Sequence, residues 1–219
     1  MTKEIVIAAY DKDLSWTNKL NNNIIKTVYR KGDILPTDEG EIKLKTNLGR
    51  CVHTFFNHIY QNYNNLSDYT FFVQDFPFDH WGNLIEVING NPEVQKASLH
   101  IGGYYGFHNN TIGTAWKMPP STQFDSGNVL SCFSNGRPQD HNPLIDVDKY
   151  WGLIFEGNHP PLYEFIPGGH FTITKEHVRL RSRELYKQIC DLLTEDVNAP
   201  WMIERLECYI FNPKYSTKL

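Results

Sequence analysis

The sequence predicts an α/β fold in which helices flank a mostly parallel central sheet. In the first half of the chain, short apolar runs rich in β-branched residues alternate with segments of helical periodicity. The chain has 219 residues, of which 40% are hydrophobic, so it is long enough to bury the core of one domain. Residues 1–219 are therefore expected to form a single domain.

Two strands around a short helix are expected at the start of the chain. "EIVIAAY" (4–10) is a nearly continuous apolar run, which is typical of a parallel strand covered on both faces. "DLSWTNKLNN" follows as a helical segment, with Asp13 as a candidate N-cap. "IIKTVYRKGD" (24–33) is expected to be the second strand, closed by a turn.

The clearest helix is expected between Asn47 and Tyr63, where apolar residues recur at spacings of three and four. These residues are Leu48, Val52, Phe55, Phe56, Ile59, Tyr60 and Tyr63. "DYTFFVQD" (68–75) then predicts a strand, and "GNLIEVING" (82–90) predicts a short helix.

A long functional loop is expected over residues 102–143, which are dense in Gly, Asn, Ser and Pro. Its aromatic residues Tyr104, Tyr105 and Trp116 are expected to line a ligand site while part of the backbone moves. No interdomain linker or internal repeat interrupts the chain, so this segment is interpreted as part of the same domain.

Two strands and two helices are expected after that loop. "YWGLIFEG" (150–157) and "HFTIT" (170–174) are both apolar runs of strand length. Helices are expected over residues 175–194 and 199–211. Basic side chains in the first of these helices alternate with Glu176 and Glu184, which indicates a solvated helix face.

Composition and missing motifs exclude several function classes. A formal net charge of -4 offers no basic surface for nucleic acid, so no nucleic-acid partner is expected. The four cysteines form no C-x-x-C pair, and the apolar run near the N-terminus is too short for a signal sequence or a membrane span. We therefore expect a soluble, cytoplasmic protein that is not secreted. There is no phosphate-binding P-loop, dinucleotide turn, zinc-protease motif or esterase elbow.

Polar residues follow two of the expected strands. Tyr10, Asp11 and Asp13 come after the first strand, and Asp75 comes where the strand over 68–75 should end. In a parallel sheet, ligands bind beyond the carboxyl ends of the strands, so these residues are expected at one edge. Asp75, with Asp79 and His80 close behind it, supplies ligands suited to Mg²⁺ or Mn²⁺ bound between two phosphates.

The same residue types also suit structural roles, and the sequence is compatible with both. Asp75 and Asp79 could cap turns around Pro77, and Asp11 and Asp13 could cap a helix. His80 and His170 could be hydrogen-bonded polar residues. Arg50, after Gly49, could be solvated or could present its guanidinium to a phosphate at the start of the long helix.

Four stretches occur in the order found in a small glycosyltransferase-like family. They are "VIAAYDKDLSW", "NLGRCVHTFFNHIYQNYNNLSDYTFFVQDFPFDH", "IPGGHFTIT" and "WMIERLECYIF". The family pattern is Tyr-Asn-Glu-Asp-x-x-Trp, then Gly-Arg before a helix, a Gln-Gly-x-Pro-x-Asp-His strand exit and a terminal Glu-Arg helix. More broadly, the chain resembles GT-A-fold nucleotide-sugar glycosyltransferases, including small virus-encoded members.

The resemblance covers nearly the whole chain outside residues 102–143. It departs from the family pattern at Gln74-Asp75-Phe76, where the pattern often has Gln-Gly, and a strict Asp-x-Asp metal motif is missing. The identity of the metal-binding carboxylate is therefore left open by the sequence.

The resemblance implies a GT-A-like fold and a metal-dependent hexosyltransferase. Such an enzyme would move a hexose from a UDP-sugar donor to a glycan or another hydroxyl acceptor, with Mn²⁺ or Mg²⁺ as cofactor. The implied nucleotide-binding residues are Tyr10, Asp11, Asp13, Arg50, Gln74, Asp75 and His170. The implied metal ligands are Asp75, Asp79 and His80. The candidates for the catalytic carboxylate are Asp79, Glu156 and Glu204.

Two other function classes are compatible with the sequence. A metal-dependent phosphoesterase would use the same Asp and His residues on a nucleotide or sugar phosphate. A non-catalytic carbohydrate-binding module would use exposed aromatic side chains, for which Trp116, Trp151 and Trp201 are candidates.

Overall fold

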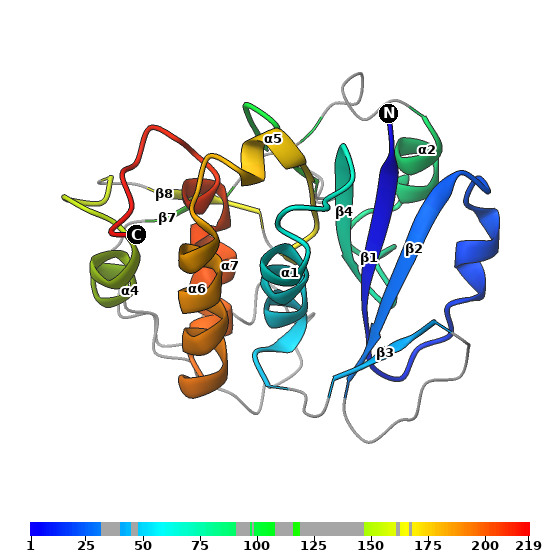
Figure 1. Cartoon of the computed structure of the whole chain (residues 1–219), viewed down its shortest axis with the longest axis horizontal. Helices are drawn as coiled ribbons and strands as arrows, with labels where there is room; N and C mark the ends of the chain where they lie inside the picture. Colours follow the sequence, from blue (N-terminus) through cyan, green and yellow to red (C-terminus); the bar gives the residue numbers. More distant parts are fainter. Residues whose placement is uncertain are drawn as a thin grey trace.

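A seven-stranded mixed sheet forms the centre of the molecule, and helices pack on both of its faces (Figure 1). The strand order is β3-β2-β1-β4-β9-β6-β5. This computed structural model describes residues 1–31, 40–44, 48–90, 97, 99–107, 116–118, 147–160, 163–166 and 168–219. The predicted α/β class is confirmed.

One half of the sheet is parallel. It contains β1 (Lys3–Ala9), β2 (Ile24–Arg30), β3 (Ile42–Lys43) and β4 (Tyr69–Gln74). All of β1 after Lys3 is buried, because helices cover both faces of the sheet. The strands predicted over 4–10, 24–33 and 68–75 are confirmed, and the carboxyl ends of β1 and β4 lie at the same edge.

The other half of the sheet is antiparallel, so the prediction of a mostly parallel sheet is wrong. β9 (Phe171–Thr174), β6 (Tyr104–Gly106) and β5 (Leu99–Ile101) continue the sheet beyond β4. The chain enters β9 at the carboxyl end of β4, with Phe171 opposite Phe72, instead of crossing over to start at the other end. An apolar run such as "HFTIT" identifies a strand but contains no information about its direction.

Tyr104 and Tyr105 belong to the core of the sheet and not to a loop at a ligand site. Only 1% of Tyr104 and 8% of Tyr105 is exposed. Strand β7 (Trp116–Met118) pairs with β8 (Tyr163–Phe165) in a separate two-stranded sheet. The remainder of the predicted loop, residues 108–115 and 119–143, lies outside the described residues.

The prediction of a strand over "YWGLIFEG" is also wrong, because these residues continue helix α4 (Val147–Ile154). Tyr150, Trp151 and Ile154 are buried at spacings that suit one helix face. Over so short an apolar run, helical and strand periodicity cannot be told apart. Glu156 follows α4 and is exposed.

Helices α1 (Arg50–Gln61), α6 (Arg183–Glu195) and α7 (Ala199–Ile210) contact one another on one side of the sheet (Figure 1). Alternate β1 residues such as Val6 pack beneath them, while Ile7 packs on the opposite side. That opposite side is covered by the short helices η1 (Ser15–Lys19) and α2 (Leu84–Asn89). The helix predicted over 47–63 is confirmed as α1.

The C-terminal region holds one more short helix than expected, because α5 (Lys175–Val178) precedes α6. Helix α7 is buried on nearly all sides, and Arg205 and Glu207 are among its buried residues. Among the described helices, none combines the length and apolar composition needed to cross a membrane.

Candidate functional site at the carboxyl edge of the sheet

Asp75 joins the carboxyl ends of β1 and β4. Its Oδ2 accepts hydrogen bonds from the backbone N–H groups of Tyr10 (2.9 Å) and Lys12 (3.2 Å), and its Oδ1 accepts one from Phe76 (3.0 Å). Trp16 Nε1 donates to the Asp75 carbonyl at 2.8 Å. The two strand exits therefore meet as predicted, and the Asp75 carboxylate has the structural role that the sequence left open.

Replacing Asp75 with alanine is expected to lower the free energy of unfolding by about 1 kcal/mol, because three backbone donors lose an acceptor that water replaces only in part at this exposed edge. Asp79→Ala is the matched control: its side chain is 62% exposed, so a change within about 0.5 kcal/mol is expected. Urea unfolding monitored by circular dichroism measures both. Equal losses of stability in the two variants would show that the Asp75 carboxylate does not stabilise the joined ends of β1 and β4.

The other residues after β1 are exposed at the same edge. Tyr10 is 47% exposed, and Phe76, from the exit of β4, is 51% exposed. Asp11 lies 3.6 Å from the ammonium of Lys12. Asp13 accepts the backbone N–H of Ser15 at 3.0 Å and is also bonded to the Ser15 hydroxyl, and these bonds lower the pKa of Asp13. Asp13 thus shapes the turn into η1, whereas Tyr10 and Asp11 face solvent.

A second group of residues surrounds Gly168, just before β9. Gln74, the last residue of β4, donates from Nε2 to the Gly168 carbonyl at 3.2 Å and to Cys51 Sγ at 3.5 Å. The Gly168 N–H donates to Glu204 Oε1 at 2.6 Å. Gln74 and Glu204, which are far apart in the sequence, therefore hold the same peptide segment from two sides.

Two histidines lie against this segment. His170 is fully buried, and its Nε2 accepts the backbone N–H of Gln74 at 3.4 Å. The His80 ring meets the His170 ring edge-on, with centroids 5.5 Å apart. Gly168 has φ +92°, and a Cβ there would lie 3.0 Å from the His80 ring, so both backbone conformation and space require glycine.

Two carboxyl side chains of α7 lie beside this segment. A Cβ built on Gly169 would be 3.9 Å from Glu204 Cγ and 3.9 Å from Glu207 Oε1. Glu204 is half-buried, whereas Glu207 is only 1% exposed. Burial, and secondarily the charge of Glu204, raises the pKa of Glu207 well above its ordinary value. Burial also raises the pKa of the Cys51 thiol to about 11, so Cys51 is not a ready thiolate nucleophile.

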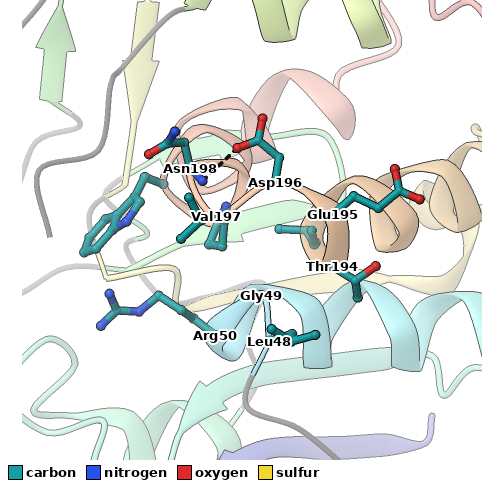
Figure 2. Close-up of a pocket in the computed structure, with 11 residues that line it drawn as sticks. Leu48, Gly49, Arg50, Thr194, Glu195, Asp196, Val197 and Asn198 are labelled. Carbon is teal, nitrogen blue, oxygen red and sulfur yellow. Dashed lines mark hydrogen bonds between the residues drawn. The ribbon is translucent and has the colours of Figure 1, made fainter.

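Arg50 lies at the rim of a cavity of about 420 Å³ between the start of α1 and the turn that joins α6 to α7 (Figure 2). Its guanidinium carbon is 4.4 Å from the centroid of the Trp201 ring. Gly49 and Arg50 have φ of 67° and 51°, so the chain enters α1 through two left-handed residues. The cavity is lined by Leu48, Gly49, Arg50, Leu193, Thr194, Glu195, Asp196, Val197, Asn198, Pro200 and Trp201.

Lys31, which follows β2, fixes the chain that leads into α1. The ammonium donates to the carbonyl of Leu48 at 2.9 Å and to that of Arg50. Only 3% of Lys31 is exposed, and burial lowers its pKa to about 8. The entry to α1 is therefore fixed by a buried cation, which places Arg50 and Cys51 next to the Glu204 segment.

The predicted site residues thus form two adjacent groups, with one exception. Gln74 and Asp75 are consecutive and connect the residues after β1 to the segment around Gly168. Glu156 is not brought to this edge: it follows α4, and its N–H donates to the Ser216 carbonyl of the C-terminal tail at 2.9 Å. The C-terminus lies beside α4 (Figure 1).

The predicted metal ligands do not converge in the described part of the chain. Asp79 Oδ2 lies 3.9 Å from His80 Nε2 and is mostly exposed, while the oxygens of Asp75 are bonded to backbone donors. No group of three or more His, Cys, Asp or Glu side chains among the described residues is arranged to hold a metal ion. The use of Mn²⁺ or Mg²⁺ stays a prediction.

Sequence reasoning missed Glu207 and Cys51. A signal for Glu207 was present, because "WMIERLECYIF" is apolar on almost every side of a helix, and a carboxyl in such a helix must be buried. Cys51 follows Arg50 directly, but nothing in the sequence indicated that its thiol would meet Gln74.

Residues 5–216 match the profile of a protein family described as a protein of unknown function (DUF3431). The matched range runs from β1 to the C-terminal tail and includes every residue of the site described above. No curated protein and no solved structure matches the chain.

Proposed function

The chain belongs to the DUF3431 family, and we propose that it is a glycosyltransferase that moves a hexose from a UDP-sugar to a hydroxyl acceptor. One observation carries the proposal: Glu204 places a half-buried carboxylate at the carboxyl edge of the parallel strands, one helical turn from the cavity at Arg50 and Trp201. Ligands of open α/β sheets bind at this edge.

Glu204 is suited to the role of general base. Its Oε1 accepts the Gly168 N–H, which fixes the orientation of the carboxylate. Oε2 has no hydrogen-bond partner within the described ranges, so it can accept the proton of an acceptor hydroxyl. As Glu204 takes that proton, the acceptor oxygen forms a bond to the anomeric carbon, and the bond from that carbon to the diphosphate breaks, releasing UDP.

The donor's charged end suits the start of α1. The first turn of this helix contains no acidic residue and no side-chain cap, and Arg50 adds a guanidinium there. Of the two carboxylates that line the cavity, Asp196 is paired with Lys149 at 2.8 Å and Glu195 is exposed. A cavity of about 420 Å³ is within the size range of small-molecule sites. We place the diphosphate there and the uracil ring against the exposed face of Tyr10.

The activity test is incubation with a panel of UDP-hexoses and sugar acceptors, with and without Mn²⁺. Transfer, or slow release of free hexose from the donor, supports the proposal, and its dependence on Mn²⁺ tests the predicted cofactor. Cleavage of simple phosphoesters would favour a phosphoesterase instead. Glycan binding without any effect of nucleotide would favour a binding module, although Trp151, at 2% exposed, is not available for that role.

UDP is expected to bind about tenfold more tightly than ADP, CDP or GDP, because the Asp11 carboxylate can accept the N3–H of uracil. The preference is modest because the Asp11 side chain is 50% exposed and water competes for it. Calorimetry of the four diphosphates measures it, and Asp11→Ala should remove the ranking while the exposed control Glu156→Ala keeps it. Equal affinities for all four in the wild type would show that Asp11 does not select the base.

A further inference from the structure

Glu207 is a buried carboxyl group without a hydrogen bond. Both of its oxygens are shielded from solvent and have no partner among the described residues. An ionised carboxylate in such a place would cost far more than a neutral one, because nothing replaces its lost hydration. The site therefore contains a carboxyl group that favours its protonated form.

The groups that face Glu207 come from three elements. Glu204 and Cys208 lie on the same helix, Cys51 projects from α1, and Tyr104 comes from β6. The thiols of Cys208 and Cys51 and the phenol of Tyr104 are neutral in their protonated forms, whereas the Glu204 carboxylate adds a like charge beside Glu207. His170 follows Gly169 in the chain, and a Cβ on Gly169 would lie 3.9 Å from both Glu204 Cγ and Glu207 Oε1. Burial and the nearby charge of Glu204 thus both raise the pKa of Glu207.

We propose that Glu204 and Glu207 form a carboxyl pair that holds one proton across neutral pH, with Glu204 charged and Glu207 neutral. The two carboxyl groups lie on one helix but in different environments, so a negative charge is stabilised better on Glu204 than on Glu207. Glu204 has a backbone N–H donor and is partly exposed, and Glu207 has neither a donor nor exposure. Glu207 is then a positioning residue that limits the pair to one negative charge.

The proton on Glu207 matters for the reaction that we propose for this site, and in that respect the inference rests on the proposed function. A second negative charge beside Glu204 would repel the anionic donor and the developing negative charge of the acceptor oxygen. Activity should therefore fall at alkaline pH as Glu207 ionises. Glu207→Gln, which is permanently neutral, should retain activity within about threefold at neutral pH and lose this alkaline decline.

The test that does not depend on activity is infrared spectroscopy of the chain labelled with ¹³C-glutamate, titrated from acid to alkaline pH. At neutral pH the wild type should show one protonated glutamate band that Glu207→Gln lacks. In Glu204→Gln the band should remain but disappear at a lower pH, because the like charge has been removed. Glu195→Gln, an exposed glutamate of α6, is the matched control and should leave the band and its midpoint unchanged.

Two results would overturn the inference: no protonated glutamate at neutral pH, or the same midpoint in the wild type and in Glu204→Gln. The second result would mean that Glu207 is buried but not coupled to Glu204. If the band behaves as expected while no sugar is transferred, the carboxyl pair stands and the proposed glycosyltransferase function fails.

Discussion

Glu204→Gln should reduce the rate of sugar transfer by a factor of about 10²–10⁴, the usual contribution of a general base. The amide oxygen of glutamine can still accept the Gly168 N–H that Glu204 Oε1 accepts at 2.6 Å, so the local backbone should be kept. The amide cannot take up the proton of the acceptor hydroxyl. Loss of rate with little change in donor affinity is the expected signature.

The experiment compares kcat and KM for transfer in the wild type, Glu204→Gln and two control variants. Glu156→Gln removes a carboxylate that the structure places beyond α4, and Glu184→Gln removes an exposed one at the start of α6, away from the cavity. Both controls should keep wild-type rates, and melting temperatures report whether each variant is folded. A folded Glu204→Gln variant with a wild-type rate would remove Glu204 from the reaction.

The elements of the fold could be predicted from local pattern where the pattern was long or strongly periodic. The helix from Arg50 has buried Val52, Phe55 and Ile59 at helical spacing, and β1 is unbroken apolar sequence from Ile5 to its end at Ala9. The prediction was wrong at "YWGLIFEG", because a short run of aromatic and aliphatic residues fits both the helical and the strand periodicity. The pattern also failed to give the direction of β9, which depends on where the chain enters the sheet.

The site could be predicted in outline because parallel strands place their carboxyl ends together. This rule brought Tyr10 and Asp75 to one edge, and the hydrogen bond between them now joins β1 to β4. The rule could not distinguish a metal ligand from a structural carboxylate at this edge. The structure shows that the Asp75 carboxylate accepts backbone N–H groups. Nor could it place Glu156, because the strand assigned to that segment is a helix.

The pair of carboxyl groups on α7 depends on tertiary packing that sequence periodicity does not contain. Gly168 and Gly169, with φ of 92° and 62°, turn the chain so that its backbone lies between Gln74 and Glu204. This turn brings the start of β9, Phe171, against helix α7, which begins at Ala199. The composition of α7 did indicate a buried carboxyl, but not its partner.

Raising the pH is expected to destabilise the wild-type chain relative to Glu207→Gln. The ordinary pKa of 4.5 applies to the unfolded chain, whereas burial and the charge of Glu204 raise the pKa of Glu207 well above it in the folded chain. Below about pH 4.5 both states hold the proton, and the contribution of Glu207 to stability is fully present. Between that pH and the raised folded pKa, only the unfolded chain releases its proton, and stability is lost by up to about 1.4 kcal/mol per pH unit.

Urea unfolding at several pH values between about 5 and about 8 covers the range over which the unfolded glutamate is ionised. The difference in unfolding free energy between wild type and Glu207→Gln cancels the other titrating groups, so its slope with pH reports Glu207 alone. Glu207→Leu removes the same titration without adding amide hydrogen-bond donors, and should give the same slope even if its stability differs by a constant. Parallel curves for the wild type and both variants would mean that Glu207 is already ionised in the folded protein, and the pair could not hold its proton.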